Sequence, residues 1–140
     1  MDCFKEGTYY SRLYQVGKTT YRFIFLDNIF YVFQPAKELE VPYVDKPQIQ
    51  WLKTQLQQSD KDVEIIFMHI PFPDSISQAG SSNELYKLLT HYPSARLILA
   101  GHQHKNLVSK FPSENNQTLT QVQTGALVKT TDNWRLPRLS

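Results

Sequence analysis

The stretch Ile98-Leu99-Ala100-Gly101-His102-Gln103-His104 decides how this sequence is interpreted, because an apolar strand ends in glycine and presents two histidines directly after it. Side chains two residues apart lie on one face of a strand, and just beyond a strand end they can converge. Glycine lacks a Cβ, so we expect Gly101 to make the sharp turn. Neutral imidazole is the commonest protein ligand for metals, so Gly-His-x-His indicates a metal or anion site. A polar turn between two strands is the alternative.

The composition is typical of one folded domain. The chain has 140 residues, of which 41% are hydrophobic and 20% charged, and this fits a globular protein with a single core. We therefore expect residues 1–140 to form a single domain. The net charge of +2 gives no indication of nucleic-acid binding. Cys3 is the only cysteine, which excludes an internal disulfide and a cysteine-based zinc cluster.

The sequence contains no indication of a membrane segment or a secretion signal. No apolar run approaches the roughly 18 residues of a membrane span. Residues 1–5 lack the apolar core of a secretory signal peptide. We expect a soluble protein, and the sequence leaves its localisation open.

The N-terminal part of the chain predicts a β-hairpin followed by a connection. Residues 9–26 are rich in aromatic and β-branched residues and are interrupted at Gly17, which indicates two antiparallel strands. The turn-forming pair Asp27-Asn28 follows. The apolar residues 29–33 predict a short strand or a loop packed on the core, and residues 34–46, with two prolines, predict a surface connection.

The middle of the chain predicts two strand–helix–strand units. Residues 47–58 have apolar residues at helical spacing after a proline, which the first turn of a helix tolerates. Residues 63–68 form a short apolar run typical of a strand buried on both faces. A second helix is expected from about residue 82 to residue 91, and it leads to a strand over residues 96–100.

Both units deliver histidines to the carboxyl ends of strands, where open α/β sheets bind their ligands. His69 follows the first strand, and His102 and His104 follow the second. Three histidines in this position favour a metal site over a polar turn. Asp27 also follows a strand and is either a fourth ligand or a turn-capping residue. We expect His91 to be structural, because it lies at the carboxyl end of a helix.

The C-terminal part of the chain predicts more strands. Residues 105–111, 118–123 and 126–129 have strand character, and the link at residues 112–116 predicts a hairpin turn. Residues 131–140 show no clear period.

These residues carry a resemblance to a known family. Phe67-Met68-His69-Ile70-Pro71, followed by Leu99-Ala100-Gly101-His102-Gln103-His104, resembles the last two metal motifs of the calcineurin-like metallophosphoesterases. The hairpin of residues 9–27 and the helix around Gln50-Trp51-Leu52 also resemble segments of that family. The resemblance extends over nearly the whole chain up to Gly125, and the combination of the two motifs is specific.

The resemblance implies a metal-dependent phosphoesterase, in which a metal-bound hydroxide hydrolyses a phosphomonoester or a phosphodiester between two divalent ions. His69 and His102 would bind one metal, and His104 would bind the other. Asp27 is not a ligand in the family pattern, so Asp27, Asn28 and Gly101 are expected only behind the ligands. The metals would be manganese, iron or zinc.

The sequence departs from the family pattern at its start. The family begins with Asp-x-His, Gly-Asp and Gly-Asn-His motifs, and none of these occurs here. The resemblance therefore implies the C-terminal half of the domain: an α/β fold that is part of a four-layer α-β-β-α sandwich, with a mixed sheet, about two main helices and no N-terminal half. Without a bridging carboxylate, three imidazoles leave two divalent ions uncompensated, so we expect one metal or none. No residue is assigned as catalytic.

Two functions follow from this pattern. In the first, the chain is part of a metal-dependent phosphoesterase that acts on a phosphate-ester substrate, although the chain alone is expected to be inactive. In the second, it is a non-catalytic, truncated chain that binds at most one metal. In both, strands such as residues 63–68 would expose an apolar face and an edge. We therefore expect pairing with a second copy, as a homo-oligomer, or with the missing half.

Overall fold

The computed structural model describes residues 8–34, 37–59, 61–73 and 81–125. Along the chain the elements are β1 (Tyr10–Val16), β2 (Thr19–Phe25), β3 (Ile29–Gln34), β4 (Lys37–Pro42), α1 (Lys46–Gln58), β5 (Val63–Phe67), α2 (Ser81–His91), β6 (Ala95–Ala100), β7 (Leu107–Pro112) and β8 (Thr118–Gln123). The strand expected at residues 126–129 and the tail 131–140 lie outside the described residues. No helix in the described part of the chain is both long and apolar enough to cross a bilayer.

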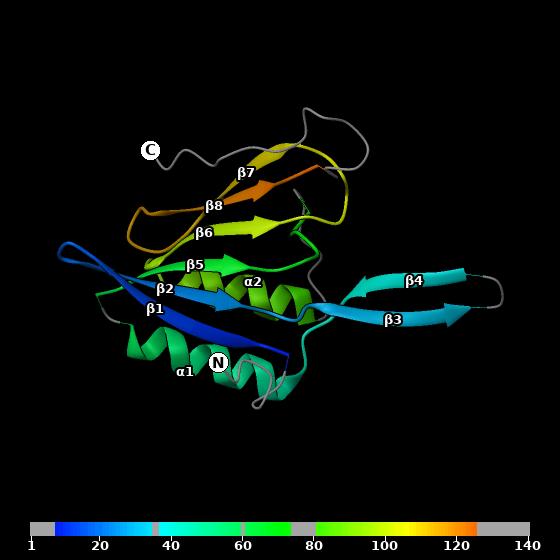
Figure 1. The fold of residues 1–140 in the computed structure, drawn as a ribbon, viewed down its shortest axis with the longest axis horizontal. Helices are drawn as coiled ribbons and strands as arrows, with labels where there is room; N and C mark the ends of the chain where they lie inside the picture. The colour runs from blue at the N-terminus through cyan, green and yellow to red at the C-terminus, as the bar shows by residue number, and fades with distance from the viewer. Residues whose placement is uncertain (1–7, 35–36, 60, 74–80, 126–140) are drawn as a thin grey trace.

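Six strands form one mixed sheet in the order β1-β2-β5-β6-β8-β7 (Figure 1). The four inner strands are parallel, and the edge strands β1 and β7 run antiparallel to their neighbours. This confirms the expected α/β class with a mixed sheet and two helices. Because β5 pairs on both sides, the expectation that this strand would expose an edge is wrong.

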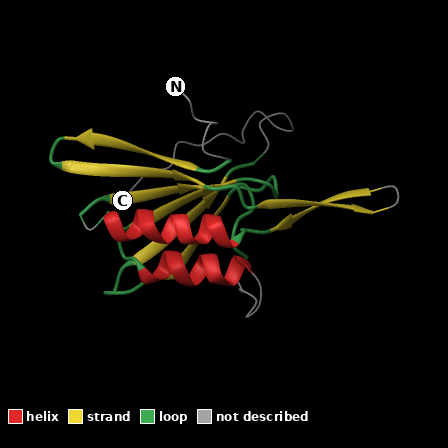
Figure 2. Cartoon of the chain, turned by 90° about the horizontal axis from the view of Figure 1, so that it is seen from below, coloured by secondary structure: helices red, strands yellow, loops and turns green. Residues whose placement is uncertain are grey.

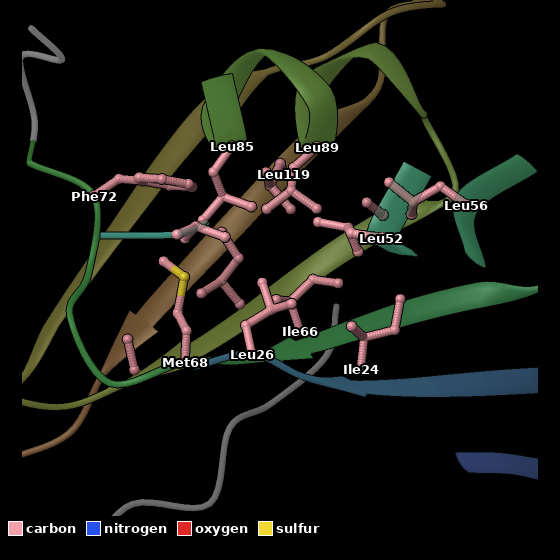
Figure 3. Packing of buried hydrophobic residues seen from close by; sticks show 14 of the residues in the cluster. Ile24, Leu26, Leu52, Leu56, Ile66, Met68, Phe72, Leu85, Leu89 and Leu119 are labelled. Atoms are coloured by element: carbon pink, nitrogen blue, oxygen red, sulfur yellow. The ribbon is translucent and has the colours of Figure 1, made fainter. Parts of the chain in front are cut away.

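Both helices pack on the same face of the sheet (Figure 2). The side chain of Asp45 accepts a hydrogen bond from the backbone N–H of Gln48 and so caps the start of α1. Leu52 and Leu56, one helical turn apart, and Leu85 and Leu89 of α2 are all buried. They meet the sheet in one core (Figure 3), so the helical spacing of the apolar residues sets which face each helix buries.

The two faces of the sheet carry different side chains. Ile24, Ile66 and Ile98 are fully buried in the core beneath the helices. Alternate residues on the same strands point to the other face, where Phe67 is only partly buried. Among the described elements, no helix covers this second face (Figure 2). Aromatic rings run across it, with Phe25 stacked on Tyr10 at 4.5 Å and on Phe67 at 4.6 Å between ring centroids.

β3 and β4 form a separate antiparallel hairpin that projects away from the main sheet (Figures 1 and 2). The sequence interpretation of residues 34–46 as a surface connection is therefore wrong, because Lys37–Pro42 is a strand. Pro42 is compatible with that strand since it is the last residue, where proline is tolerated in a hairpin edge. The pairing of β3 with β4 is a contact between segments, which the composition of either segment alone does not reveal.

Candidate metal site

Two neighbouring parallel strands place the histidine-bearing loops side by side. Phe67 at the end of β5 is in register with Leu99 near the end of β6. Just beyond, the backbone N–H of Gly101 donates to the carbonyl of His69 at 3.1 Å. The loop that starts with His69 and the loop that starts with Gly101 are thus joined by a continuation of the sheet ladder.

This arrangement brings two imidazoles together. Nε2 of His69 lies 3.2 Å from Nδ1 of His102. The ring centroids are 5.0 Å apart, and the rings are nearly perpendicular. His69 is exposed and His102 is half-buried, so an ion in solvent can reach the pair.

His104 does not complete a three-histidine site. Within the described residues there is no group of three His, Cys, Asp or Glu side chains placed to hold a metal ion. The reason lies in the backbone, because His102 and His104 have φ angles of 67° and 55°. These left-handed residues end the two-residue alternation that would have put both side chains on one face. Among the described residues His104 is therefore not grouped with His69 and His102, and its role as a metal ligand stays a prediction.

Gly101 does not make the turn that was expected of it. The residues in the left-handed region are His102 and His104, and Gly101 is not among them. A Cβ placed on Gly101 would meet no atom within 4 Å. The backbone strain of the loop is thus carried by the candidate ligands themselves, and it costs of order 1 kcal/mol or more per residue.

Asn28 holds the backbone of the His69 loop in place. The buried Asn28 side chain accepts hydrogen bonds from the backbone N–H groups of His69, at 3.0 Å, and Ile70, at 3.1 Å. It also donates to the carbonyl of Ile70 at 2.7 Å. Asn28 therefore secures the backbone of the loop that carries the candidate ligand His69.

Two glutamines play the same part nearby and were missed in the sequence. Gln48 of α1 accepts from the N–H of Asp27 and donates to its carbonyl. Gln121 of β8 does the same for Phe72. Both glutamines are buried. The sequence holds no signal that distinguishes them, because α1 contains four other glutamines and β8 also carries Gln123. Asp27 is fixed through its backbone, and its carboxylate belongs to no metal-binding group among the described residues.

An apolar hollow of about 440 Å³ adjoins His69. It is lined by residues at the carboxyl ends of β2, β5 and β6 and by Thr124: Phe25, Leu26, Phe67, Met68, His69, Leu99, Ala100 and Thr124. The hollow is open to solvent, and its lining places an apolar surface beside the exposed imidazole of His69.

The nitrogens of His69 and His102 have the spacing of two ligands of one divalent ion, but they are only part of a complete ligand set. Two nitrogens that bind one zinc ion at about 2.0–2.1 Å lie roughly 3.0–3.4 Å apart, and the nitrogens of His69 and His102 are 3.2 Å apart. A pair of metals needs a bridging carboxylate, and within the described residues no Asp or Glu joins these histidines. The described residues thus place two candidate ligands together and do not fit a two-metal centre.

Comparison with known proteins gives the following. The model of the calcineurin-like phosphoesterases matches residues 5–106. Curated protein sequences give no significant match. Among solved structures, the chain is similar to a putative 5'-nucleotidase from Staphylococcus aureus, crystallised with alpha-ketoglutarate, with a TM-score of 0.51 and 17% identity. The match covers 82% of this chain and 23% of the nucleotidase. At this identity the likeness concerns the fold, and this chain spans less than a quarter of that protein's length.

Proposed function

This chain belongs to the calcineurin-like phosphoesterase family, and on that premise we propose that it holds a divalent metal ion of a phosphoesterase through His69 and His102. The observation that carries the proposal is the 3.2 Å approach of the two imidazole nitrogens. The ion is manganese, iron or zinc, which imidazole ligands suit. The substrate is a phosphomonoester or a phosphodiester.

The described residues have defined parts in this function. A bound divalent ion supplies Lewis-acid polarisation of a phosphoryl oxygen. His69 and His102 bind and orient the ion, and Asn28 fixes the His69 backbone through its two accepted hydrogen bonds. Structural and catalytic zinc sites use at least three protein ligands, so a zinc centre here would need ligands beyond His69 and His102.

A second candidate function is non-catalytic metal binding. It is favoured by the lack of a carboxylate beside the imidazole pair in the part of the chain that the structure describes. In that case the chain binds one metal ion and does not hydrolyse phosphate esters.

Metal binding and turnover are tested separately. Isothermal titration with Mn²⁺ and with Zn²⁺ is expected to show one site, and His69→Ala or His102→Ala to weaken it by about tenfold or more, since each removes one of two ligands. His91→Ala is the matched control, because His91 pairs with Glu114 at the far end of α2 and should leave binding unchanged.

The same samples are assayed with p-nitrophenyl phosphate and bis-p-nitrophenyl phosphate. Hydrolysis that is lost in both histidine variants supports the phosphoesterase, and metal binding without hydrolysis supports the non-catalytic function. If the wild-type chain binds neither metal, both proposals are wrong.

A further inference from the structure

The two edges of the six-stranded sheet differ in how they are protected. Edge strands invite pairing with other chains unless charges, prolines or bulges interrupt them. β7 carries the exposed Lys110 and ends at Pro112. β1 pairs with β2 in unbroken register over all seven residues and contains no proline. Its one charged residue, Arg12, lies over the ring of Tyr10 on the same strand, 5.3 Å from the ring centroid.

β1 also exposes apolar side chains at this edge. Leu13, Tyr14 and Val16 are 57%, 51% and 64% exposed. Large exposed apolar residues on an edge strand mark a surface for strand pairing. Because the apolar residues lie on both faces of the strand, they favour pairing along the edge over docking on one face.

The sequence of β1 is complementary to itself. When a second copy runs antiparallel with Leu13 opposite Leu13, the remaining pairs are Tyr10 with Val16, Ser11 with Gln15 and Arg12 with Tyr14. Every pair joins residues of matched character: apolar with apolar, polar with polar, and a cation with an aromatic ring. Moving the centre to Arg12 would instead put two arginines opposite each other, which is unfavourable.

We propose that β1 pairs with β1 of a second copy in the register centred on Leu13, to give a twofold-symmetric dimer with one continuous sheet. Antiparallel pairing of identical strands satisfies a twofold axis. Each copy uses the β1 edge of the six-stranded sheet, and Lys110 and Pro112 of β7 oppose growth at the other edge. The dimer does not depend on the metal site, which lies at the carboxyl ends of the inner strands.

Sedimentation equilibrium of the full chain tests the proposal. The wild type is expected to be a dimer, and Leu13→Lys to weaken the dimer by about tenfold or more, because it puts two like charges directly opposite each other. Val108→Lys on β7 is the matched control, since Val108 is 52% exposed at the other edge, and it should leave the dimer intact. Both positions are more than half exposed, and circular dichroism checks that both variants are folded.

A cysteine variant tests the register. Opposite residues of antiparallel strands are about 4.5–5.5 Å apart between Cα atoms, within the range of a disulfide. In a Cys3→Ser background, Leu13→Cys should form an intermolecular disulfide readily, and Gln15→Cys, which faces Ser11 in this register, should not.

Several outcomes overturn the proposal. These are a monomeric wild type, open polymers, a dimer that Leu13→Lys leaves intact, or a dimer that Val108→Lys disrupts. A wild-type monomer that binds phosphatidylcholine vesicles would assign this edge to a lipid surface instead. Equal cross-linking of Leu13→Cys and Gln15→Cys would overturn the register.

Discussion

At the scale of single residues, the histidine loop concentrates strain on its candidate ligands. His102 and His104 adopt left-handed backbone angles, although a glycine directly precedes them. Non-glycine residues persist in such conformations where the surroundings fix them, and such positions cluster at functional sites. Pairing of the His102 ring with His69 at 3.2 Å is one of the contacts that this backbone makes possible.

Gly101→Ala is expected to be neutral or stabilising. Gly101 is not left-handed and has open space around its missing Cβ, so alanine fits. Alanine lowers the conformational entropy of the unfolded chain, which stabilises the fold by about 0.4–1 kcal/mol. Urea unfolding measures the effect. The matched variant is Gly17→Ala, which should destabilise because Gly17 has a φ of 59°. A large loss of stability in Gly101→Ala would contradict this description of the loop.

Asn28→Leu is expected to destabilise the protein by about 2–4 kcal/mol, because it leaves buried backbone groups of His69 and Ile70 without partners. Asn28→Asp keeps the acceptor oxygen and is expected to lose less. Chemical denaturation measures both. Gln103→Leu, an exposed position in the same region, is the control and should change stability little. Similar losses in Asn28→Leu and Gln103→Leu would show that Asn28 does not secure the loop.

At the scale of elements, the second residue of β5 carries a buried carboxyl group. Glu64 is fully buried, and neither carboxylate oxygen accepts a hydrogen bond within the described part of the chain. The nearby Ser59 hydroxyl donates to the carbonyl of Leu56 instead. Burial therefore raises the pKa of Glu64, while the positive charge of Arg22 opposes the rise.

This raised pKa predicts a loss of stability with rising pH. The folded state holds the Glu64 proton more tightly than the unfolded chain does. The stability that this proton adds is therefore complete below the ordinary pKa of glutamate, and it is lost as the pH rises through the higher pKa of the folded state. Glu64→Gln should remove this loss and be more stable than the wild type at neutral pH. Unfolding at about pH 5 and about pH 8 measures it.

Glu84→Gln is the control for this experiment, because Glu84 is an exposed glutamate in the first turn of α2. Glu84→Gln replaces an exposed carboxylate instead of a buried one, so the stability of this variant should keep the wild-type pH dependence. A Glu64→Gln variant that is less stable than the wild type at neutral pH would show that the ionised carboxylate is needed.

At the scale of the whole molecule, the sheet has one face covered by helices and one that no described helix covers (Figure 2). Two adjacent residues of β5 point to opposite faces of the sheet. Ile66 is fully buried among leucines from both helices. Phe67 points the other way and is only partly buried, in contact with the rings of Phe23 and Phe25.

Ile66→Ala is expected to cost about 2–5 kcal/mol, as usual for a buried aliphatic residue. Phe67→Ala removes a larger side chain but should cost less, since less of it leaves water on folding. Thermal and urea unfolding compare the two variants. Equal losses would indicate that the second face is covered in solution as completely as the first.

The sequence by itself determined the two helices, the strands of the main sheet and the placement of His69 and His102 at strand ends. Apolar periodicity is a local property that fixes which face of an element is buried. The sequence also determined the family, because the His69 motif and the Gly101-His102-Gln103-His104 motif, at the ends of neighbouring strands, are specific in combination.

Only the tertiary structure decided which groups meet. The pairing of β3 with β4, the approach of His69 to His102 and the separation of His104 follow from the paths of the backbone. Asn28 reaches the backbone of His69 across 41 residues of sequence. Such contacts depend on long-range packing and on φ angles that neighbouring segments impose, and a local sequence pattern does not specify them.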